Sequence, residues 1–248
     1  SEMCIRDRSY MYLLLGYKVF KRIVKLDQTF LKALKKSYVK IMKISHGVGY
    51  FEVRRKSAKL IKKAFDPLKV EIRGSEHLPK DQKIIFIYNH LRNHPYFTVD
   101  NTFQITLDSH FISSKILYKY YKNPGTRVVR FSLPEEDEHR RYYNKFNFIR
   151  VFSKDFTPSG FTKKQIRATN EEFYNKAANE LKNNTNLVFS PEGSSYYTDE
   201  SPGTFRKGIF KLAASFKEQP LFVPIVLVNF DKLPSKDSFK CEIKPPFR

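Results

Sequence analysis

Two histidines follow directly after an apolar stretch, which makes residues 84–100 the first candidate for chemistry. The run Lys83–Tyr88 is followed by Asn89-His90 and then by Asn93-His94. A continuous apolar run of this length is typical of a central strand that is covered on both faces. Polar groups just beyond the carboxyl end of a parallel strand lie where open α/β sheets bind their ligands.

A carboxylate in reach of a histidine is the usual arrangement for taking a proton from a hydroxyl. Asp100 is the first acidic residue after the two histidines and follows His94 by six positions. The segment therefore predicts a general base with an acidic partner. The ordinary alternative is that both histidines are surface or capping residues.

A second stretch repeats this architecture. The apolar run Asn186–Ser190 leads into the turn Pro191–Ser195. Gly193 would let backbone N–H groups approach a ligand closely, and Ser194 could donate to an oxyanion or a phosphate. On its own, however, Pro-Glu-Gly-Ser is a common turn.

The charge of the chain points to an anionic partner. There are 46 Lys and Arg against 25 Asp and Glu, a net charge of +21. Phospholipid surfaces, nucleic acids and phosphorylated substrates would all fit this charge. The alternative explanation is codon bias, because the composition is that of proteins from AT-rich genes, in which lysine is frequent without any functional reason.

Much of the charge lies in two predicted amphipathic helices that end at Asp66. Residues 18–66 carry 15 basic and 3 acidic residues, a net +12. In the first helix, over Lys18–Ser45, gaps of three and four predict one apolar stripe, formed by Ile23, Leu26, Phe30, Leu34, Tyr38 and Ile41. Two consecutive basic amphipathic helices favour a membrane-surface element over a merely solvated face.

The chain divides into three parts. Residues 1–8 resemble the translation of an adapter used in making sequencing libraries, so they are left out of fold reasoning. Residues 9–66 form the basic helical element, and residues 67–248 form the main domain. Without Cys4 only Cys241 remains, which allows neither an internal disulfide nor a cysteine metal site.

Strands and helices alternate through the main domain, which predicts an α/β fold with a mostly parallel sheet flanked by helices. The expected strands are Leu68–Gly74, Lys83–Tyr88, His110–Lys115, Thr126–Phe131, Phe148–Phe152, Asn186–Ser190, Leu221–Val228 and Phe239–Lys244. The expected helices are Asn101–Leu107, Ile116–Tyr121, Pro134–Phe146, Thr162–Asn183 and Gly203–Lys217.

The order of these segments resembles the glycerolipid acyltransferase superfamily (PlsC-like) over Leu68–Lys244. The matching features are a strand followed by Asn-His and an Asp, then Phe189-x-Pro-Glu-Gly-Ser194, Phe205-x-Lys-Gly208 and Val223-Pro-Ile225. The resemblance implies transfer of a fatty acyl chain from acyl-CoA or acyl carrier protein to glycerol 3-phosphate or lysophosphatidate. It also implies association with an anionic membrane surface, on the cytoplasmic face and in a bacterium, and no cofactor or metal.

The resemblance assigns roles to residues of both stretches. A motif histidine removes the proton from the acceptor hydroxyl, and a motif aspartate orients it. The commonest family spacing would place the acid for His90 at position 95, which is Pro95. His94, Pro95 and Asp100 fit the branch that reads Asn-His-Pro followed by an Asp, so we predict His94 and Asp100 as the base and its partner, with His90 in support.

The second stretch is expected to hold the acceptor. In the resemblance, this role falls on Phe189, Pro191, Glu192, Gly193 and Ser194. The arginine that is often found after the motif is Ser195 here. Arg206 and Lys207 are expected to supply the positive charge instead.

Three alternatives stay open. The acceptor could be another lysolipid or an amino-acid lipid, with the same fold and chemistry. The protein could be a non-catalytic membrane-surface protein that kept the fold. Nucleic-acid binding through the basic helices is disfavoured, because no recognised reader motif is present.

Overall fold

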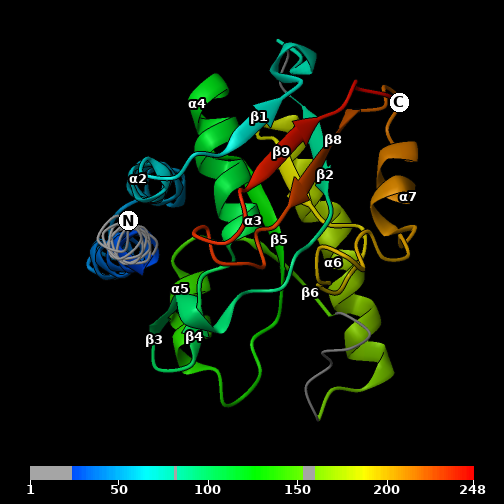
Figure 1. The fold of residues 1–248 in the computed structure, drawn as a ribbon. Coiled ribbons are helices and arrows are strands. Elements are labelled where there is room, and N and C mark those ends of the chain that lie inside the picture. Colours follow the sequence, from blue (N-terminus) through cyan, green and yellow to red (C-terminus); the bar gives the residue numbers. More distant parts are fainter. Residues whose placement is uncertain (1–23, 81–82, 153–159) are drawn as a thin grey trace, which may run out of the picture.

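A computed structural model describes residues 24–80, 83–152 and 160–248. The adapter-like residues 1–8 and the start of the first predicted helix lie outside these ranges. The α/β prediction is confirmed: one sheet has seven strands in the order β1-β9-β8-β2-β7-β5-β6 (Figure 1). These strands are β1 (Glu71–Arg73), β2 (Ile84–Tyr88), β5 (Thr126–Arg130), β6 (Ile149–Val151), β7 (Leu187–Phe189), β8 (Leu221–Val228) and β9 (Lys240–Ile243).

The sheet is mostly parallel. The strands β8, β2, β7, β5 and β6 all run in the same direction. At the other edge, β9 pairs with β8 antiparallel and with β1 parallel. The carboxyl ends of β2, β5 and β7 therefore meet at one edge of the sheet.

Helices cover both faces of the sheet. One face carries residues 24–42 and α2 (Tyr50–Phe65), together with a helical run made of α3 (Leu107–Phe111), a π-helical stretch (Ile112–Leu117) and α4 (Tyr118–Tyr121). The other face carries α6 (Lys163–Lys182) and α7 (Gly208–Ala214). The strand β2 is buried on both sides: Ile84, Phe86 and Tyr88 enter the first core, and Ile85 and Ile87 enter the second. This is the covered central strand that its apolar run predicted.

Smaller elements lie beyond the carboxyl edge of the sheet. The hairpin of β3 (Thr98–Asp100) and β4 (Phe103–Gln104) lies beside α5 (Asp137–Asn144) at the bottom of Figure 1. A short 3₁₀ turn, Pro95–Phe97, lies at this edge as well. A second one, Ser75–His77, joins β1 to β2 at the opposite edge.

Two predicted elements are wrong. The segment Asn101–Leu107 was expected to be helical but contains β4, and α3 starts only at its last residue. The segment His110–Lys115 was expected to be a strand but is helical. Its apolar residues, such as Phe111 and Ile112, are completely buried, and a short buried helix cannot be distinguished from a strand by periodicity.

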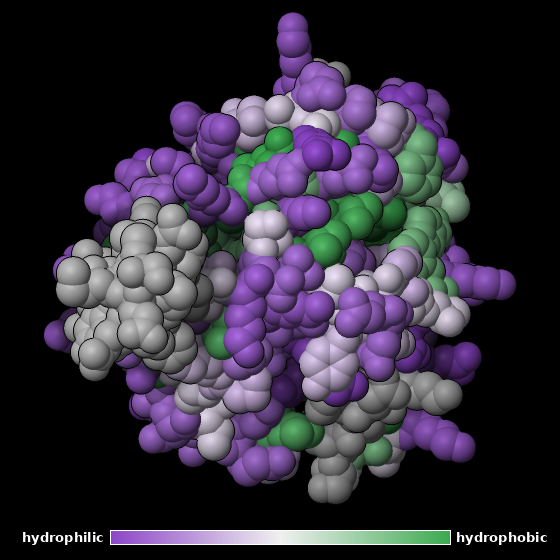
Figure 2. All heavy atoms as spheres, viewed as in Figure 1, coloured by the Kyte–Doolittle hydropathy of each residue, from purple (hydrophilic) through white to green (hydrophobic). Residues whose placement is uncertain are grey.

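The N-terminal helical pair is part of the main core. In residues 24–42 the predicted stripe is buried, with Phe30, Leu34 and Ile41 fully inaccessible. The apolar side of α2 is buried as well. The lysines point outward, and Figure 2 shows hydrophilic residues over the outer side of α2. The apolar stripes are therefore not available to a membrane, and none of the described helices is long and apolar enough to cross one.

Candidate active site

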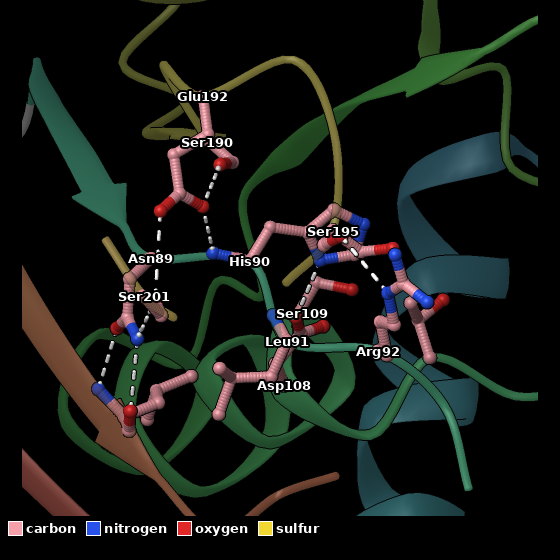
Figure 3. Close-up of polar contacts among 12 residues, drawn as sticks. Asn89, His90, Leu91, Arg92, Asp108, Ser109, Ser190, Glu192, Ser195 and Ser201 are labelled. Carbon is pink, nitrogen blue, oxygen red and sulfur yellow. Dashed lines mark hydrogen bonds and ion pairs between the residues drawn. The ribbon is translucent and has the colours of Figure 1, made fainter. Parts of the chain in front are cut away.

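His90 is held rigidly at the carboxyl end of β2. Just before it, the Asn89 side chain donates to the Leu227 carbonyl (2.9 Å) and accepts from the Leu227 N–H (2.7 Å), as a strand would. The His90 carbonyl accepts from the Tyr196 N–H at 2.9 Å. The His90 N–H donates to the Glu192 carboxylate at 2.5 Å. Figure 3 shows the contacts of Asn89 and of Glu192 at this strand end.

The acidic partner of His90 is Asp108. The ring atom Nδ1 of His90 lies 2.6 Å from Oδ2 of Asp108, although the two residues are 18 positions apart. Asp108 lies in the first turn of α3, and its side chain is only 1% exposed. It also accepts from the backbone N–H groups of Leu91 (2.9 Å) and Ser109. These contacts fix the position of the carboxylate beside the imidazole ring.

The environment of His90 favours its protonated form. Burial acts to lower the pKa of His90, but the charge and hydrogen bond of Asp108 and the charge of Glu192 outweigh it, so the pKa lies above the ordinary value. Because Nδ1 is engaged by Asp108, Nε2 is the nitrogen that can exchange a proton with a ligand. The side chain is about a quarter exposed and lines a cavity.

The predicted pair of His94 and Asp100 does not form in the described structure. His94 caps the turn Pro95–Phe97, where its Nδ1 accepts from the Tyr96 N–H at 3.2 Å. Asp100 instead accepts from the Tyr38 hydroxyl at 2.7 Å and lies 3.9 Å from Arg141. The acid contact raises the pKa of Tyr38, as does its burial, which is the larger cause. The two residues are therefore engaged in separate local contacts.

Glu192 braces the two strand ends rather than facing the cavity. Its carboxylate, 1% exposed, accepts from the backbone N–H groups of His90 and Gly203 (2.7 Å) and from the Ser190 hydroxyl (3.4 Å). The neighbouring Gly193 has φ +72°, and a Cβ there would lie 2.5 Å from the Arg206 side chain. The glycine thus allows the turn and the close approach of this arginine.

The cavity has a volume of about 680 Å³ and combines polar and apolar walls. The predicted residues Phe189, Pro191, Gly193, Ser194 and Arg206 line it, whereas Lys207, at the start of α7, and Glu192 do not. Its apolar wall is formed by Val128, Val129, Val151, Phe152, Phe173 and Phe189. A ligand with a polar reacting end and a long apolar part would match these walls.

Sequence reasoning missed Asp108, which holds His90 but does not itself line the cavity. It also missed charged residues that do line it, among them Arg127 and Arg130 on β5. Arg130 pairs with Glu136 through two contacts of 2.6 Å. Arg127 is buried and donates to the Ser109 hydroxyl at 3.2 Å. The sequence did contain a signal for Asp108, which lies among apolar residues at the start of a helix. Burying an acidic side chain there costs free energy unless it has hydrogen-bond partners.

No group of three or more His, Cys, Asp or Glu residues that could hold a metal ion is found in the described ranges. Cys241 is buried, and burial raises the pKa of its thiol to about 12.

Comparison with known proteins gives a match in structure alone. No family model matches the chain, and no curated protein matches it. Among solved structures, the chain is similar to the crystal structure of the 1-acyl-sn-glycerophosphate acyltransferase PlsC from Thermotoga maritima. The match covers 92% of this chain and 86% of the other, with a TM-score of 0.53 and 17% sequence identity. The fold that the sequence resemblance implied is therefore confirmed.

Proposed function

We propose that this protein is an O-acyltransferase that moves a fatty acyl chain from acyl-CoA or acyl carrier protein to a hydroxyl of glycerol 3-phosphate or lysophosphatidate. The observation that carries the proposal is the His90–Asp108 pair, in which His90 lines a cavity with an apolar wall. The fold it shares with a solved acyltransferase supports the same reading.

The geometry suits the following sequence of steps. Nε2 of His90 takes the proton from the acceptor hydroxyl while Asp108 holds Nδ1 and stabilises the imidazolium. The acceptor oxygen attacks the thioester carbonyl carbon and forms a tetrahedral oxyanion. When this intermediate collapses, the C–S bond breaks and the thiolate receives the proton from His90. His90, Asp108 and the brace from Glu192 thus act as one unit.

The two substrates would occupy different parts of the cavity. The acyl chain fits the apolar wall around Val151 and Phe173, because burial of an apolar chain is worth roughly 0.8 kcal/mol per CH₂. The anionic group of the acceptor would bind to arginines that also line the cavity, Arg130 and Arg206. These arginines take over the role that the motif arginine, replaced by Ser195, would have had.

An assay of the whole chain tests the proposal. Purified protein is incubated with labelled acyl-CoA or acyl carrier protein and a panel of acceptors, and the products are identified by mass. The panel contains glycerol 3-phosphate, lysophosphatidate, other lysolipids and an amino-acid lipid precursor. A product from one of the first two supports the proposal. If only the other acceptors give a product, the acceptor is another lysolipid or an amino-acid lipid. If no donor gives a product, the result favours a non-catalytic membrane-surface protein.

We further propose that the protein binds anionic membranes through the outer side of the helical pair. Since the apolar stripes are buried, the attraction would come from exposed lysines, such as Lys35, Lys36, Lys40, Lys43, Lys56, Lys59 and Lys63. Each basic residue near such a surface is worth about 1 kcal/mol, and salt screens it. Vesicle co-sedimentation should therefore give binding to anionic vesicles that weakens with salt. Equal binding to neutral vesicles at every salt concentration would contradict this.

A further inference from the structure

Exposed aromatic side chains gather on the loops that build the candidate site. Tyr96 is 36% exposed, Tyr197 49% and Phe205 46%. A fourth, Phe161, is 44% exposed and packs on the cavity residue Phe152, with ring centroids 4.8 Å apart. Aromatic rings of this size are normally buried, because each carries a large apolar area. Four exposed rings beside one cavity therefore call for an explanation by function.

The first three rings belong to loops that are hydrogen-bonded to one another. The Tyr196 N–H donates to the His90 carbonyl, and the Arg92 N–H donates to the Tyr196 carbonyl, both at 2.9 Å. The Arg206 N–H donates to the Pro191 carbonyl at 2.7 Å. The four rings do not line the cavity themselves, whereas Ser195, Arg206 and other residues of the same loops do. We call Tyr96, Phe161, Tyr197 and Phe205 the aromatic rim.

Positive charge accompanies the aromatic rim. The Arg92 guanidinium lies over the Tyr197 ring at 4.7 Å from its centroid. Lys207 follows Phe205 closely in the chain and is exposed, as are Lys163 and Lys164 after Phe161. The exposed acidic residues of the same loops are Asp199, which lies 3.8 Å from Lys232, and Glu200. Proteins carry aromatic and basic side chains together where they contact a membrane–water interface. There the aromatic side chains lie at the level of the headgroups, and the cations bind lipid phosphates.

We propose that the aromatic rim docks on the phospholipid membrane and turns the mouth of the cavity toward it. A lipid substrate could then enter the cavity from the bilayer without its chain crossing water. The rim would be the surface by which the proposed enzyme meets its lipid substrate. Docking of the rim on a membrane does not depend on the proposed function, and only the benefit of docking for catalysis rests on that function. It also differs from docking by the helical pair, since the rim lies on the site loops.

The chain offers a matched control for the rim. Tyr120 on α4 is 41% exposed, and its ring has a cation over it, the Lys119 ammonium at 4.9 Å. It therefore resembles Tyr197 in type, exposure and partner. Because α4 precedes β5, Tyr120 lies at the opposite edge of the sheet from His90. Figure 1 shows α4 near the top, away from the carboxyl edge.

The test compares three variants of the full chain with the parent protein: Tyr96→Ser/Tyr197→Ser, Tyr120→Ser, and Tyr50→Ser/Phe51→Ser at the exposed start of α2. Binding is measured on vesicles of phosphatidylcholine with phosphatidylglycerol. From the area of the two rings, the rim variant should bind about tenfold more weakly or worse, and Tyr120→Ser should bind as the parent does. Circular dichroism and thermal melting show whether each variant is folded.

Activity is measured with the acceptor in vesicles and with a short-chain acceptor dissolved as monomers. The rim variant should lose about tenfold on the vesicle acceptor and keep its rate on the monomeric one. The inference is overturned if the rim variant binds vesicles like the parent, if Tyr120→Ser loses as much, or if only the Tyr50→Ser/Phe51→Ser variant loses binding. Failure of the parent to acylate either acceptor would count against the proposed function, while the vesicle binding would still decide the role of the rim.

Discussion

Replacing Asp108 by asparagine gives the sharpest test of the His90–Asp108 pair. The asparagine side chain has nearly the same size but carries no charge, and its amide nitrogen donates where the carboxylate accepts. Asp108, in the buried start of α3, accepts from the ring Nδ1 of His90 and from the backbone N–H groups of Leu91 and Ser109. An amide nitrogen that faces Nδ1 would favour the tautomer with its proton on Nε2, which cannot take a proton from the acceptor.

The expected loss follows from this geometry. Losing general-base catalysis typically costs 10²–10⁴-fold in rate. At 1.36 kcal/mol for each factor of ten, that is about 3–5 kcal/mol of barrier height. Asp108→Asn and His90→Ala should each lose this much in kcat/KM, and the double variant should be little worse than either, because residues that act as one unit are not additive.

The pH dependence adds a second readout with a definite sign. In the parent protein, kcat/KM should rise with pH as His90 loses its proton, with a midpoint above the ordinary pKa of about 6.5. Asp108 raises the pKa of His90 because its negative charge stabilises the imidazolium. Removing that charge should move the midpoint of the residual activity to lower pH.

Asp100→Asn and His94→Ala are the matched controls, because both positions are close in the chain and have other partners. They should stay within a few-fold of the parent rate, with the fold checked by circular dichroism. If either control loses 10²-fold or more while Asp108→Asn stays active, the pair was assigned wrongly, and the prediction made from sequence spacing was right.

Three further outcomes follow from buried groups. Glu192→Ala leaves the N–H groups of His90 and Gly203 without their acceptor, so it should cost about 2–4 kcal/mol of unfolding free energy and several degrees in thermal melting; an unchanged melting temperature with reduced turnover would instead support a role in holding the acceptor. Arg54→Met removes the contacts to the Phe146 and Asn147 carbonyls at 2.8 Å each and should cost about 3–5 kcal/mol in denaturant unfolding, with exposed Lys59→Met as the neutral control. In a Cys4→Ser chain, Cys241 should react with a thiol reagent only as fast as the protein unfolds, because its thiol is buried and its pKa is raised to about 12; rapid labelling under native conditions would contradict this.

The sequence predicted the strand end that carries His90 but not the residue that pairs with it. The run Ile84–Tyr88 is apolar on both faces, and such a pattern depends only on neighbouring positions. The partner depends on a contact between residues 18 positions apart, across an intervening segment that includes the β3–β4 hairpin. Periodicity carries no information on such a contact, and the spacing in the family motif favours a different pair, His94 with Asp100.

For the helical pair, too, the sequence predicted the local pattern but not the tertiary contact. The stripe in residues 24–42 was predicted correctly as one apolar face, and Phe30 and Leu34 lie on it. A stripe that packs on a sheet has the same period as one that lies on a membrane. Only the tertiary contacts separate the two, such as Asp27, which accepts from the Ser235 N–H at 3.0 Å and so ties the helix to the loop before β9.

The segment between His90 and Asp108 contains Asp100, the acid that the family spacing pairs with His94, and in the structure Asp100 has a different role. Asp100 holds the β3–β4 hairpin to the helical pair through the Tyr38 hydroxyl, and Phe103 packs against the same tyrosine, with ring centroids 5.8 Å apart. The next residues along the hairpin, including Gln104, form one wall of the cavity. A longer connection between base and acid thus adds a wall to the site, and it also joins that wall to the basic helices.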